Sequence, residues 1–336
     1  IPDERKQGLL SSLRGDFVRR FPADGFWKKL RSLWRVWGVT SYIEADRVEV
    51  YHGLSNELPL NIRKAGGVKS VVTIHDLIFL RYPECYPLID RIIYNYKFRK
   101  ACRQADRIIA VSECTKRDIV QLYHINPAKI DVVYQGCDVQ FRLPAAEELK
   151  AEVKEIYSLP ERYILYVGSI EKRKNLMLLA KALLHLDEEY RVIAVGKHTP
   201  YADRVTAFLR KHGLEDRLCM IHGVPFAHLP ALYQLATTFV YPSRYEGFGI
   251  PLLEALNSGV PAIGAHGSCL EEAGGPDSLY VSPDDDRALA DAIRSTYTDA
   301  NLRKKMIDGG KEYAKRFEPE PIARQILEIY RKCFKS

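Results

Sequence analysis

Short apolar runs alternate with helical segments along most of this chain, and this alternation limits the folds open to it. In the first half, residues 70–74 (SVVTI), 107–111 (RIIAV) and 129–133 (KIDVV) have the β-branched composition of buried strands. Helices are expected over about residues 88–105 and 113–123. Strands that alternate with helices predict a parallel sheet with helices on both faces.

The second half repeats the pattern after residues 135–147, whose turn residues and proline break the periodicity and indicate a linker. Further strands are expected over residues 163–167, 190–195, 218–223, 238–241, 261–265 and 278–281. The sequence therefore predicts an α/β fold of two Rossmann-like, doubly wound domains, the first at 1–144 and the second at 145–318. Sheets of this kind bind ligands at the carboxyl ends of their strands.

The cysteine and hydrophobic patterns bear on the compartment. The seven cysteines are scattered without a C-x-x-C pair, which favours a reduced, cytoplasmic setting without structural zinc. No run of about 18 apolar residues is present, and no charged-then-apolar leader opens the sequence. We expect a cytoplasmic protein, either free or held peripherally at the inner membrane face.

Basic residues are concentrated in the first half. Residues 1–144 contain 24 Lys and Arg against 16 Asp and Glu. Segment 26–38 also holds all the tryptophans, on one helical stripe, with basic residues on another. Two interpretations stay open: an amphipathic helix that rests on a membrane or a lipid-linked acceptor, or a helix whose tryptophans fill the core. We expect no nucleic-acid partner, because no recognised binding motif accompanies the charge.

Residues 238–259 combine a strand, a turn and a helix in one short segment. Gly247 and Gly249 are expected to take positive φ and to let a ligand approach bare amides. The N terminus of the helix that follows favours an anion such as phosphate. Glu246 and Glu254 place a carboxylate at each end of this element. From the local pattern alone, a plain strand-to-helix joint with two surface acids is the alternative.

Two further turns follow predicted strands. Residues 168–175 (GSIEKRKN) open a helix with free amides, and Lys172, Arg173 and Lys174 add cations suited to a diphosphate leaving group. His75 stands at the end of a strand, where its ring can exchange a hydrogen bond with a sugar hydroxyl. The alternatives are a solvated charged turn and a helix-capping or core histidine.

Other chemistries fit the sequence poorly. None of the remaining histidines shows a metal-ligand spacing with another histidine or a cysteine, so we expect neither a metal nor a cofactor. Ser243 lies outside a G-x-S-x-G elbow, and no P-loop is present. These observations argue against hydrolase and NTPase activity.

Taken together, these segments resemble the retaining GT-B glycosyltransferases of the family-4 type. The resemblance rests on YVGSIEKRKNLMLLAKAL, on HGVPFAHLPALYQLATTFVYPSRYEGFGIPLLEALNSGVPAIG, and on VVTIHDLIF followed by AVSECTKRDI. It covers about residues 50–320, and EGFGIPLLE matches the family's E-x7-E motif. It implies two domains facing a cleft, and transfer of a sugar from a nucleotide-diphosphate sugar to a glycan or lipid-linked acceptor, with retention of anomeric configuration.

The resemblance also implies a role for each matching residue. Arg173 and Lys174 would hold the donor diphosphate, and Glu254 would bind the nucleotide ribose. Glu246 would face the transferred sugar, and His75 would lie beside the reacting carbon. The remaining donor-binding positions are Gly168, Ser169 and Gly247, the backbone of Val224 beside the base, and the amides of Phe248 and Gly249 in the phosphate cradle.

The family pattern further implies that the final helix, within residues 319–336, crosses back onto the first domain and allows the domains to close about a hinge. The sequence departs from the pattern in two places. It opens at IPDERKQGLL without the family's first strand and glycine-rich loop, so either about forty N-terminal residues are missing from this sequence or the first domain is incomplete. Ser169 stands where many relatives carry a phosphate-binding arginine, and Arg173 is expected to replace it.

Two competing functions share the same fold. The first is a catalytically inactive nucleotide-sugar-binding protein, which the missing glycine-rich loop favours. The second is a nucleotide-sugar epimerase, which would isomerise the donor without an acceptor. Donor turnover and acceptor dependence separate these functions from glycosyl transfer.

Overall fold

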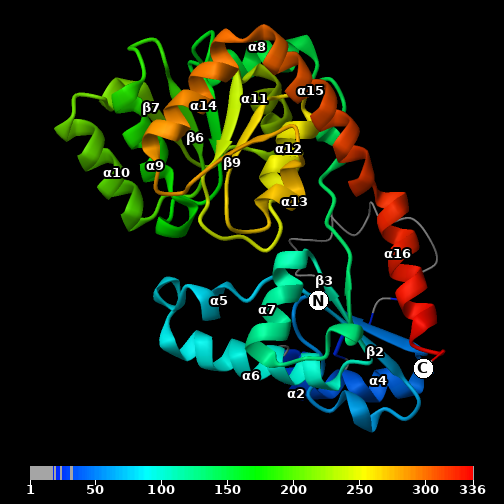
Figure 1. Cartoon of the computed structure of the whole chain (residues 1–336). Helices are drawn as coiled ribbons and strands as arrows, with labels where there is room; N and C mark the ends of the chain where they lie inside the picture. The colour runs from blue at the N-terminus through cyan, green and yellow to red at the C-terminus, as the bar shows by residue number, and fades with distance from the viewer. Residues whose placement is uncertain (1–17, 19, 23–24, 31–32, 336) are drawn as a thin grey trace.

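The computed structural model describes residues 18, 20–22, 25–30 and 33–335, which form two α/β domains stacked on one another (Figure 1). The first domain contains a parallel sheet with the strand order β1-β2-β3-β4. Its strands are Val50–Gly53 (β1), Lys69–Ile74 (β2), Arg107–Ala110 (β3) and Ile130–Val132 (β4). The sequence pattern did not predict β1, an edge strand in which only Gly53 is fully buried.

The helices of the first domain are α2 (Gly25–Lys29), α4 (Val39–Ala45), α5 (Ile78–Arg81), α6 (Leu88–Gln104) and α7 (Glu113–Tyr123). Residues of α4, α5, α6 and α7 share one core with Val72 and Ile108, so these helices pack on the same face of the sheet. Helix α7 begins where the Ser112 hydroxyl accepts a hydrogen bond from the Thr115 amide, and it ends at His124, whose φ is 55°. Helix α6 spans the sequence-predicted segment at 88–105 almost to the residue.

The tryptophan segment does not form the single helix that its periodicity suggested. Helix α2 ends at Lys29, and a π-helical turn at Trp34–Gly38 leads into α4. Trp34 is only 4% exposed and packs edge-on against Tyr42, so this residue belongs to the core. Trp37 is exposed, and Lys28 and Arg31 of the basic stripe lie outside the described side chains.

The second domain contains a parallel sheet with the order β10-β9-β8-β5-β6-β7. The chain runs outward from β5 to β7, and then returns to the other side of β5 to form β8, β9 and β10. The strand order therefore reverses between β5 and β8, which is where doubly wound sheets form their ligand crevice. The strands are Ile164–Val167 (β5), Val192–Val195 (β6), Leu218–Ile221 (β7), Thr238–Tyr241 (β8), Ala262–Ala265 (β9) and Leu279–Val281 (β10).

Alternate residues of these strands build two cores on opposite faces of the sheet. In β5, Leu165 packs into one apolar cluster and Ile164 and Tyr166 pack into another. The covering helices are α8 (Glu147–Ile156), α9 (Leu176–Ala182), α10 (Pro200–Lys211), α11 (Leu229–Leu235), α12 (Ile250–Asn257), α13 (Leu270–Gly274), α14 (Asp286–Thr298) and α15 (Ala300–Ala314). Burial on both faces explains why these strands are continuous apolar runs.

The last helix, α16 (Pro319–Lys332), returns to the first domain (Figure 1). Ile329 packs with Val71 and Ile109 of the first sheet. The Tyr330 hydroxyl lies 2.7 Å from Nδ1 of His52, and Lys332 pairs with Asp131 at 2.8 Å. The chain therefore joins its domains twice, through the linker before α8 and through α16.

Candidate active site

The turns that follow β5 and β8 meet at the switch point of the second sheet. The Arg244 amide donates a hydrogen bond of 2.9 Å to the Arg173 carbonyl, which links the two turns directly. The Asn175 side chain donates to the carbonyls of Pro242 and Pro283. These hydrogen bonds hold residues 168–175 and 242–249 together, so the two turns form one surface at the carboxyl edge of the sheet.

A buried carboxylate lies at the centre of this surface. Glu246 Oε1 is 2.9 Å from an Arg173 guanidinium nitrogen and 3.1 Å from Lys174 Nζ. The hydroxyls of Tyr241 and Ser243 donate to the same oxygen at 2.9 and 2.7 Å. Burial alone would raise the pKa of Glu246, but Lys174 and Arg173 outweigh this effect and hold the pKa below its ordinary value. Glu246 is therefore an ionised carboxylate fixed by four donors.

The two cations expected to hold a diphosphate are themselves paired. Arg173 is only 8% exposed, and its guanidinium donates to the Tyr245 carbonyl and to Glu171 Oε1. Glu171 also accepts from the Ser169 hydroxyl at 2.8 Å, whereas Lys174 Nζ donates to the Tyr241 hydroxyl at 2.6 Å. Glu171, to which no sequence motif assigns a role, is therefore a second carboxylate partner of Arg173, besides Glu246.

The glycines of the turn act in different ways. Gly249 has φ of 114° and directly precedes α12, as the sequence predicted. The prediction of positive φ at Gly247 is wrong. Glycine is required there for another reason, because a Cβ would lie 2.1 Å from the His75 carbonyl of the first domain. Gly168 extends β5, and its amide donates to Val195. The close approach at 247 is thus a contact between domains.

Further predicted residues line the first turn of α12 and its surroundings. Glu254 Oε2 accepts from the Tyr233 hydroxyl at 2.8 Å, and burial raises the pKa of Glu254 to about 7. Phe248 is buried, with its ring centre 5.6 Å from that of Tyr134, so only its backbone is available for a ligand. Val224 follows β7 and packs partly against the same core.

His75 enters from the first domain, at the end of β2. Its Nε2 lies 2.8 Å from the Leu54 carbonyl, and its Nδ1 lies 3.1 Å from the side-chain nitrogen of Gln135. Because a carbonyl only accepts, Nε2 carries the proton and Nδ1 accepts from Gln135. The next residue, Asp76, accepts from the Ile78 amide, and burial raises the pKa of Asp76. The sequence pattern predicts only a linker at Gln135 and does not indicate this contact with His75.

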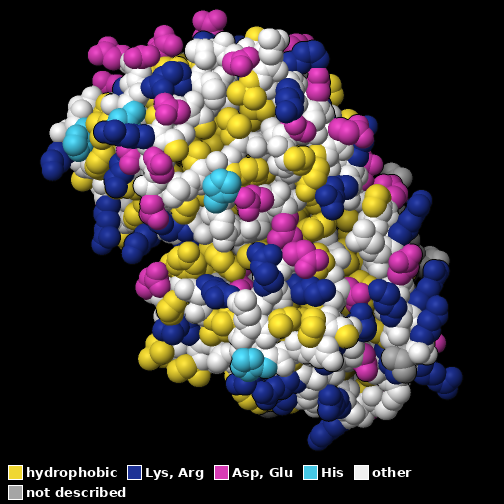
Figure 2. Space-filling model, viewed as in Figure 1, with side chains coloured by type: hydrophobic (Ala, Val, Ile, Leu, Met, Phe, Trp, Pro, Cys, Tyr) yellow, Lys and Arg dark blue, Asp and Glu magenta, His cyan; other side chains and the backbone are white. Residues whose placement is uncertain are grey.

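Direct hydrogen bonds hold the two domains together beside this site. The Ser112 hydroxyl donates to the Gly247 carbonyl at 2.6 Å, and the Tyr245 hydroxyl donates to Asp118 at 2.7 Å. Glu272 accepts from the amides of Glu113 and Cys114. Figure 2 shows acidic and basic side chains along the line where the domains meet. Sequence reasoning missed these contacts, because each partner is distant along the chain.

A polar pocket of about 390 Å³ opens at this junction. Its lining comes from both domains and consists of Arg81, Tyr82, Cys114, Arg117, Asp118, Gln121, Tyr245 and Gly267. Arg81 is neutralised by Asp118 at 2.7 Å, whereas Arg117 is exposed. Since Tyr245 directly precedes Glu246, the pocket adjoins the carboxylate cluster.

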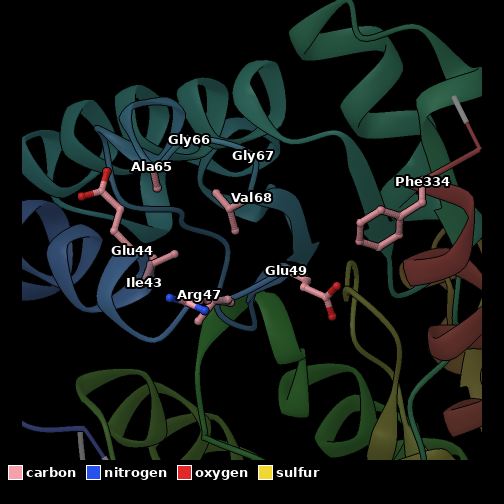
Figure 3. A pocket seen from close by; sticks show the side chains of 10 residues that line it. Ile43, Glu44, Arg47, Glu49, Ala65, Gly66, Gly67, Val68 and Phe334 are labelled. Atoms are coloured by element: carbon pink, nitrogen blue, oxygen red, sulfur yellow. The ribbon is translucent and has the colours of Figure 1, made fainter.

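Another pocket, of about 370 Å³, lies at the opposite edge of the first sheet (Figure 3). Its walls include Arg47 and Glu49, just before β1, and Gly67, just before β2, and Phe334 after α16 closes one side. These positions are at the amino ends of the strands. Ligands of doubly wound sheets bind at the carboxyl ends, so this pocket is separate from the candidate site.

The arrangement defines a class of protein. Two parallel α/β domains, with charged turns at the switch point of the second sheet facing the first domain, are the architecture of GT-B glycosyltransferases. A glycosyltransferase from Rickettsia africae aligns with a TM-score of 0.77 at 20% identity, covering 99% of this chain and 88% of its own. Anabaena HepE, in complex with UDP and glucose, aligns with a TM-score of 0.72 at 18% identity, covering 91% and 89%.

Sequence comparison identifies the family. Residues 2–141 match the model described as Glycosyltransferase Family 4, and residues 150–313 match Glycosyl transferases group 1. O-antigen chain mannosyltransferase B of Escherichia coli is 31% identical over 288 residues, which cover 84% of this chain and 74% of that protein. O-antigen chain mannosyltransferase RfbU of Salmonella typhimurium is 28% identical over 268 residues, covering 80% and 71%. The chain belongs to glycosyltransferase family 4 and is a glycosyltransferase, as its motifs indicated.

Proposed function

We infer that this glycosyltransferase moves a mannosyl group from a nucleotide-diphosphate sugar to a glycan or lipid-linked acceptor, with retention of anomeric configuration. The observation that carries the proposal is the convergence of Arg173 and Lys174 on Glu246, at the switch point and opposite His75. Mannose is favoured because the E. coli and Salmonella relatives are both named O-antigen mannosyltransferases.

The donor diphosphate would bind Arg173 and Lys174. Glu171 is 40% exposed at its side chain, so it can leave the Arg173 guanidinium for solvent when a phosphate arrives. Charge-assisted bonds from a guanidinium and an ammonium would then stabilise the charge that develops on the leaving diphosphate. The amides of Phe248 and Gly249, at the start of α12, would add the positive end of the helix dipole.

The carboxylates of the E-x7-E motif would bind different parts of the donor. Within the described residues, the donors that fix Glu246 share Oε1, which leaves Oε2 for a hydroxyl of the transferred sugar. Glu254 is held by Tyr233 through Oε2, so its other oxygen would accept from the ribose hydroxyls. HepE binds UDP and glucose on the same fold, which supports a nucleotide-sugar donor.

The proposed reaction takes place on one face of the sugar. The bond from the anomeric carbon to the diphosphate oxygen breaks, and the acceptor oxygen forms a bond to that carbon from the same side. The acceptor proton passes to the departing phosphate oxygen, so charge and atoms balance without a separate base. His75 would lie beside the reacting carbon and orient a sugar hydroxyl, with its ring held by Leu54 and Gln135.

The acceptor would approach through the polar junction pocket. Arg117 is exposed there, and Tyr245 connects the pocket wall to Glu246. The variant Arg117→Ala is expected to raise KM for the acceptor while leaving the donor KM unchanged. A change confined to the donor KM would assign the pocket to the donor instead.

Substitutions in the cluster test the site. Glu246→Ala and Lys174→Ala are each expected to lower donor turnover about 100-fold or more, because they remove charge stabilisation at the reacting centre. Lys172→Ala is the matched control, since this exposed lysine lies in the same turn. Circular dichroism and thermal melting establish that the variants fold. Turnover near the wild-type rate in both cluster variants would refute the assignment.

Donor identity and stereochemistry need separate measurements. A thermal-shift panel of GDP-mannose, UDP-glucose and ADP-glucose is expected to show one selective stabilisation, because a ligand that binds only the folded state raises its melting temperature. The anomeric coupling constant of the product, measured by NMR, distinguishes retention from inversion. Donor binding without transfer to any acceptor would instead support an inactive nucleotide-sugar-binding protein.

A further inference from the structure

Helix α6 exposes large apolar side chains along one stripe. The stripe comprises Leu88, Ile89, Ile92, Ile93 and Tyr96, whose exposed fractions range from 45% to 71%. Their spacing places them side by side over the first turns of the helix. Figure 2 shows hydrophobic side chains at the lower left of the first domain, where α6 begins in Figure 1.

The opposite face of α6 packs into the hydrophobic core of the first domain. Ala101 and Cys102 are almost completely buried there. The rings of Tyr94 and Phe98 pack around Phe79, at centroid distances of 5.9 and 5.5 Å. Folding therefore does not require apolar residues on the outer face, and contiguous exposed apolar surface of this kind marks an interaction site.

Basic side chains continue the stripe toward the end of the helix. Lys100 lies over the ring of Tyr96 at 5.7 Å, and Arg103 is exposed one turn further on. Arg63 donates to the Arg103 carbonyl and brings another exposed cation to this end. The helix dipole accounts for cations at a C terminus, but it does not account for the apolar stripe before them. The surface thus combines an apolar half with a cationic half.

We propose that the outer face of α6 docks this enzyme on an anionic lipid bilayer. The apolar stripe would enter the boundary between headgroups and acyl chains, and Lys100 and Arg103 would contact lipid phosphates. A second copy of the chain is a poorer partner, because α6 contains a single acid, Asp90, to face the cations of its mate. The described part of the chain contains no helix able to span a membrane.

The position of α6 gives the docking a consequence for catalysis. The chain just before the helix faces the second domain, and the Tyr82 ring lies 5.7 Å from that of Tyr245. Tyr82 also lines the junction pocket. A bilayer against the first turns of α6 would therefore lie close to that pocket, where a lipid-linked acceptor could be reached without leaving the membrane.

Vesicle co-sedimentation tests the proposal with the purified chain. Vesicles of phosphatidylcholine with phosphatidylglycerol are compared with vesicles of phosphatidylcholine alone. Ile89→Glu with Ile92→Glu is expected to weaken binding to the anionic vesicles about tenfold or more, because charge replaces the inserted side chains. Lys100→Gln with Arg103→Gln is expected to weaken it about tenfold, and to remove most of its dependence on salt.

The matched control is Ile156→Glu with Leu184→Glu, at positions of the second domain that are 53% and 44% exposed. This control is expected to bind as the wild type does. If the apolar double variant melts at a lower temperature, Ile92→Gln alone repeats the measurement.

Several outcomes would overturn the proposal. One is wild-type binding by the apolar variant, and another is a wild-type chain that binds neither vesicle. A third is a wild-type dimer that the apolar substitutions convert to a monomer, with no binding to lipid, because the face would then serve a second copy. None of these measurements needs a donor, so they are independent of the function proposed above.

Discussion

The carboxylate of Glu272, in the second domain, accepts a hydrogen bond of 2.7 Å from the backbone amide of Glu113, the first residue of helix α7 in the first domain. Its other oxygen accepts from the Cys114 amide at 2.9 Å. The first amides of a helix lack partners within the helix, and a negative charge is favourable beside them. Here the other domain supplies that charge, so domain closure and the capping of α7 occur together.

Removing this charge should weaken closure. Glu272→Gln is expected to lower kcat/KM several-fold and the free energy of unfolding by about 1 kcal/mol, because a neutral amide is a poorer partner for the helix end. Steady-state kinetics and urea unfolding measure the two effects. Glu271→Gln is the control, since among the described residues the Glu271 carboxylate forms an ion pair only with the half-exposed His266. Equal losses in both variants would show that the effect is not specific to the α7 contact.

The contact between Gly247 and His75 leads to a second prediction about domain closure. A Cβ at this position would lie 2.1 Å from the His75 carbonyl, so Gly247→Ala must push the domains apart. We expect kcat/KM to fall about tenfold or more, because a small displacement of the reacting groups is costly. Gly66→Ala is the control, since a Cβ there meets nothing within 4 Å. Unchanged kinetics in Gly247→Ala would mean that the closed arrangement is not the active one.

Glu254 should make stability depend on pH. Burial raises its pKa to about 7, above the ordinary value of 4.5, so the folded protein holds this proton more tightly than the unfolded chain. Ionisation of this carboxyl therefore has no cost below both pKa values, and it opposes folding increasingly as the pH rises from 4.5 to about 7, above which the cost stays constant. Wild type should lose about 2 kcal/mol relative to Glu254→Gln between roughly pH 5 and pH 8. Urea unfolding at both pH values measures the difference, and a constant difference would contradict the prediction.

Asn175 should matter for stability as well as for the site. It is buried with φ of 62°, and its amide donates to the carbonyls of Pro242 and Pro283. Asn175→Ala leaves both carbonyls without this donor and places Ala in a left-handed conformation, so we expect a loss of about 2 to 4 kcal/mol. Asn175→Gly removes the same donor without the backbone penalty and should lose about 1 kcal/mol less. Equal losses would show that the backbone conformation contributes little.

The sequence predicted the second domain better than the first. Strands buried on both faces are continuous apolar runs, so β5, β6 and β8 were found close to their expected positions. The edge strand β1 is mostly half-buried and lacked that signal. The periodicity of the tryptophan segment predicts one helix, because the π-helical turn at Trp34–Gly38 does not disturb the spacing of the stripe.

The sequence by itself determined the features that depend on neighbouring residues. These are the left-handed glycine before α12, the spacing of Glu246 and Glu254, and the cations of the turn after β5. The tertiary structure decided which groups these residues meet. Arg173 and Lys174 bind Glu246 from a turn distant in sequence, Gln135 orients His75, and Glu272 caps a helix of the other domain. These pairings depend on strand order and on how the domains close, and neither leaves a local pattern. The apolar face of α6 shows the same limit, because only the fold reveals which side of an apolar helix the core has used.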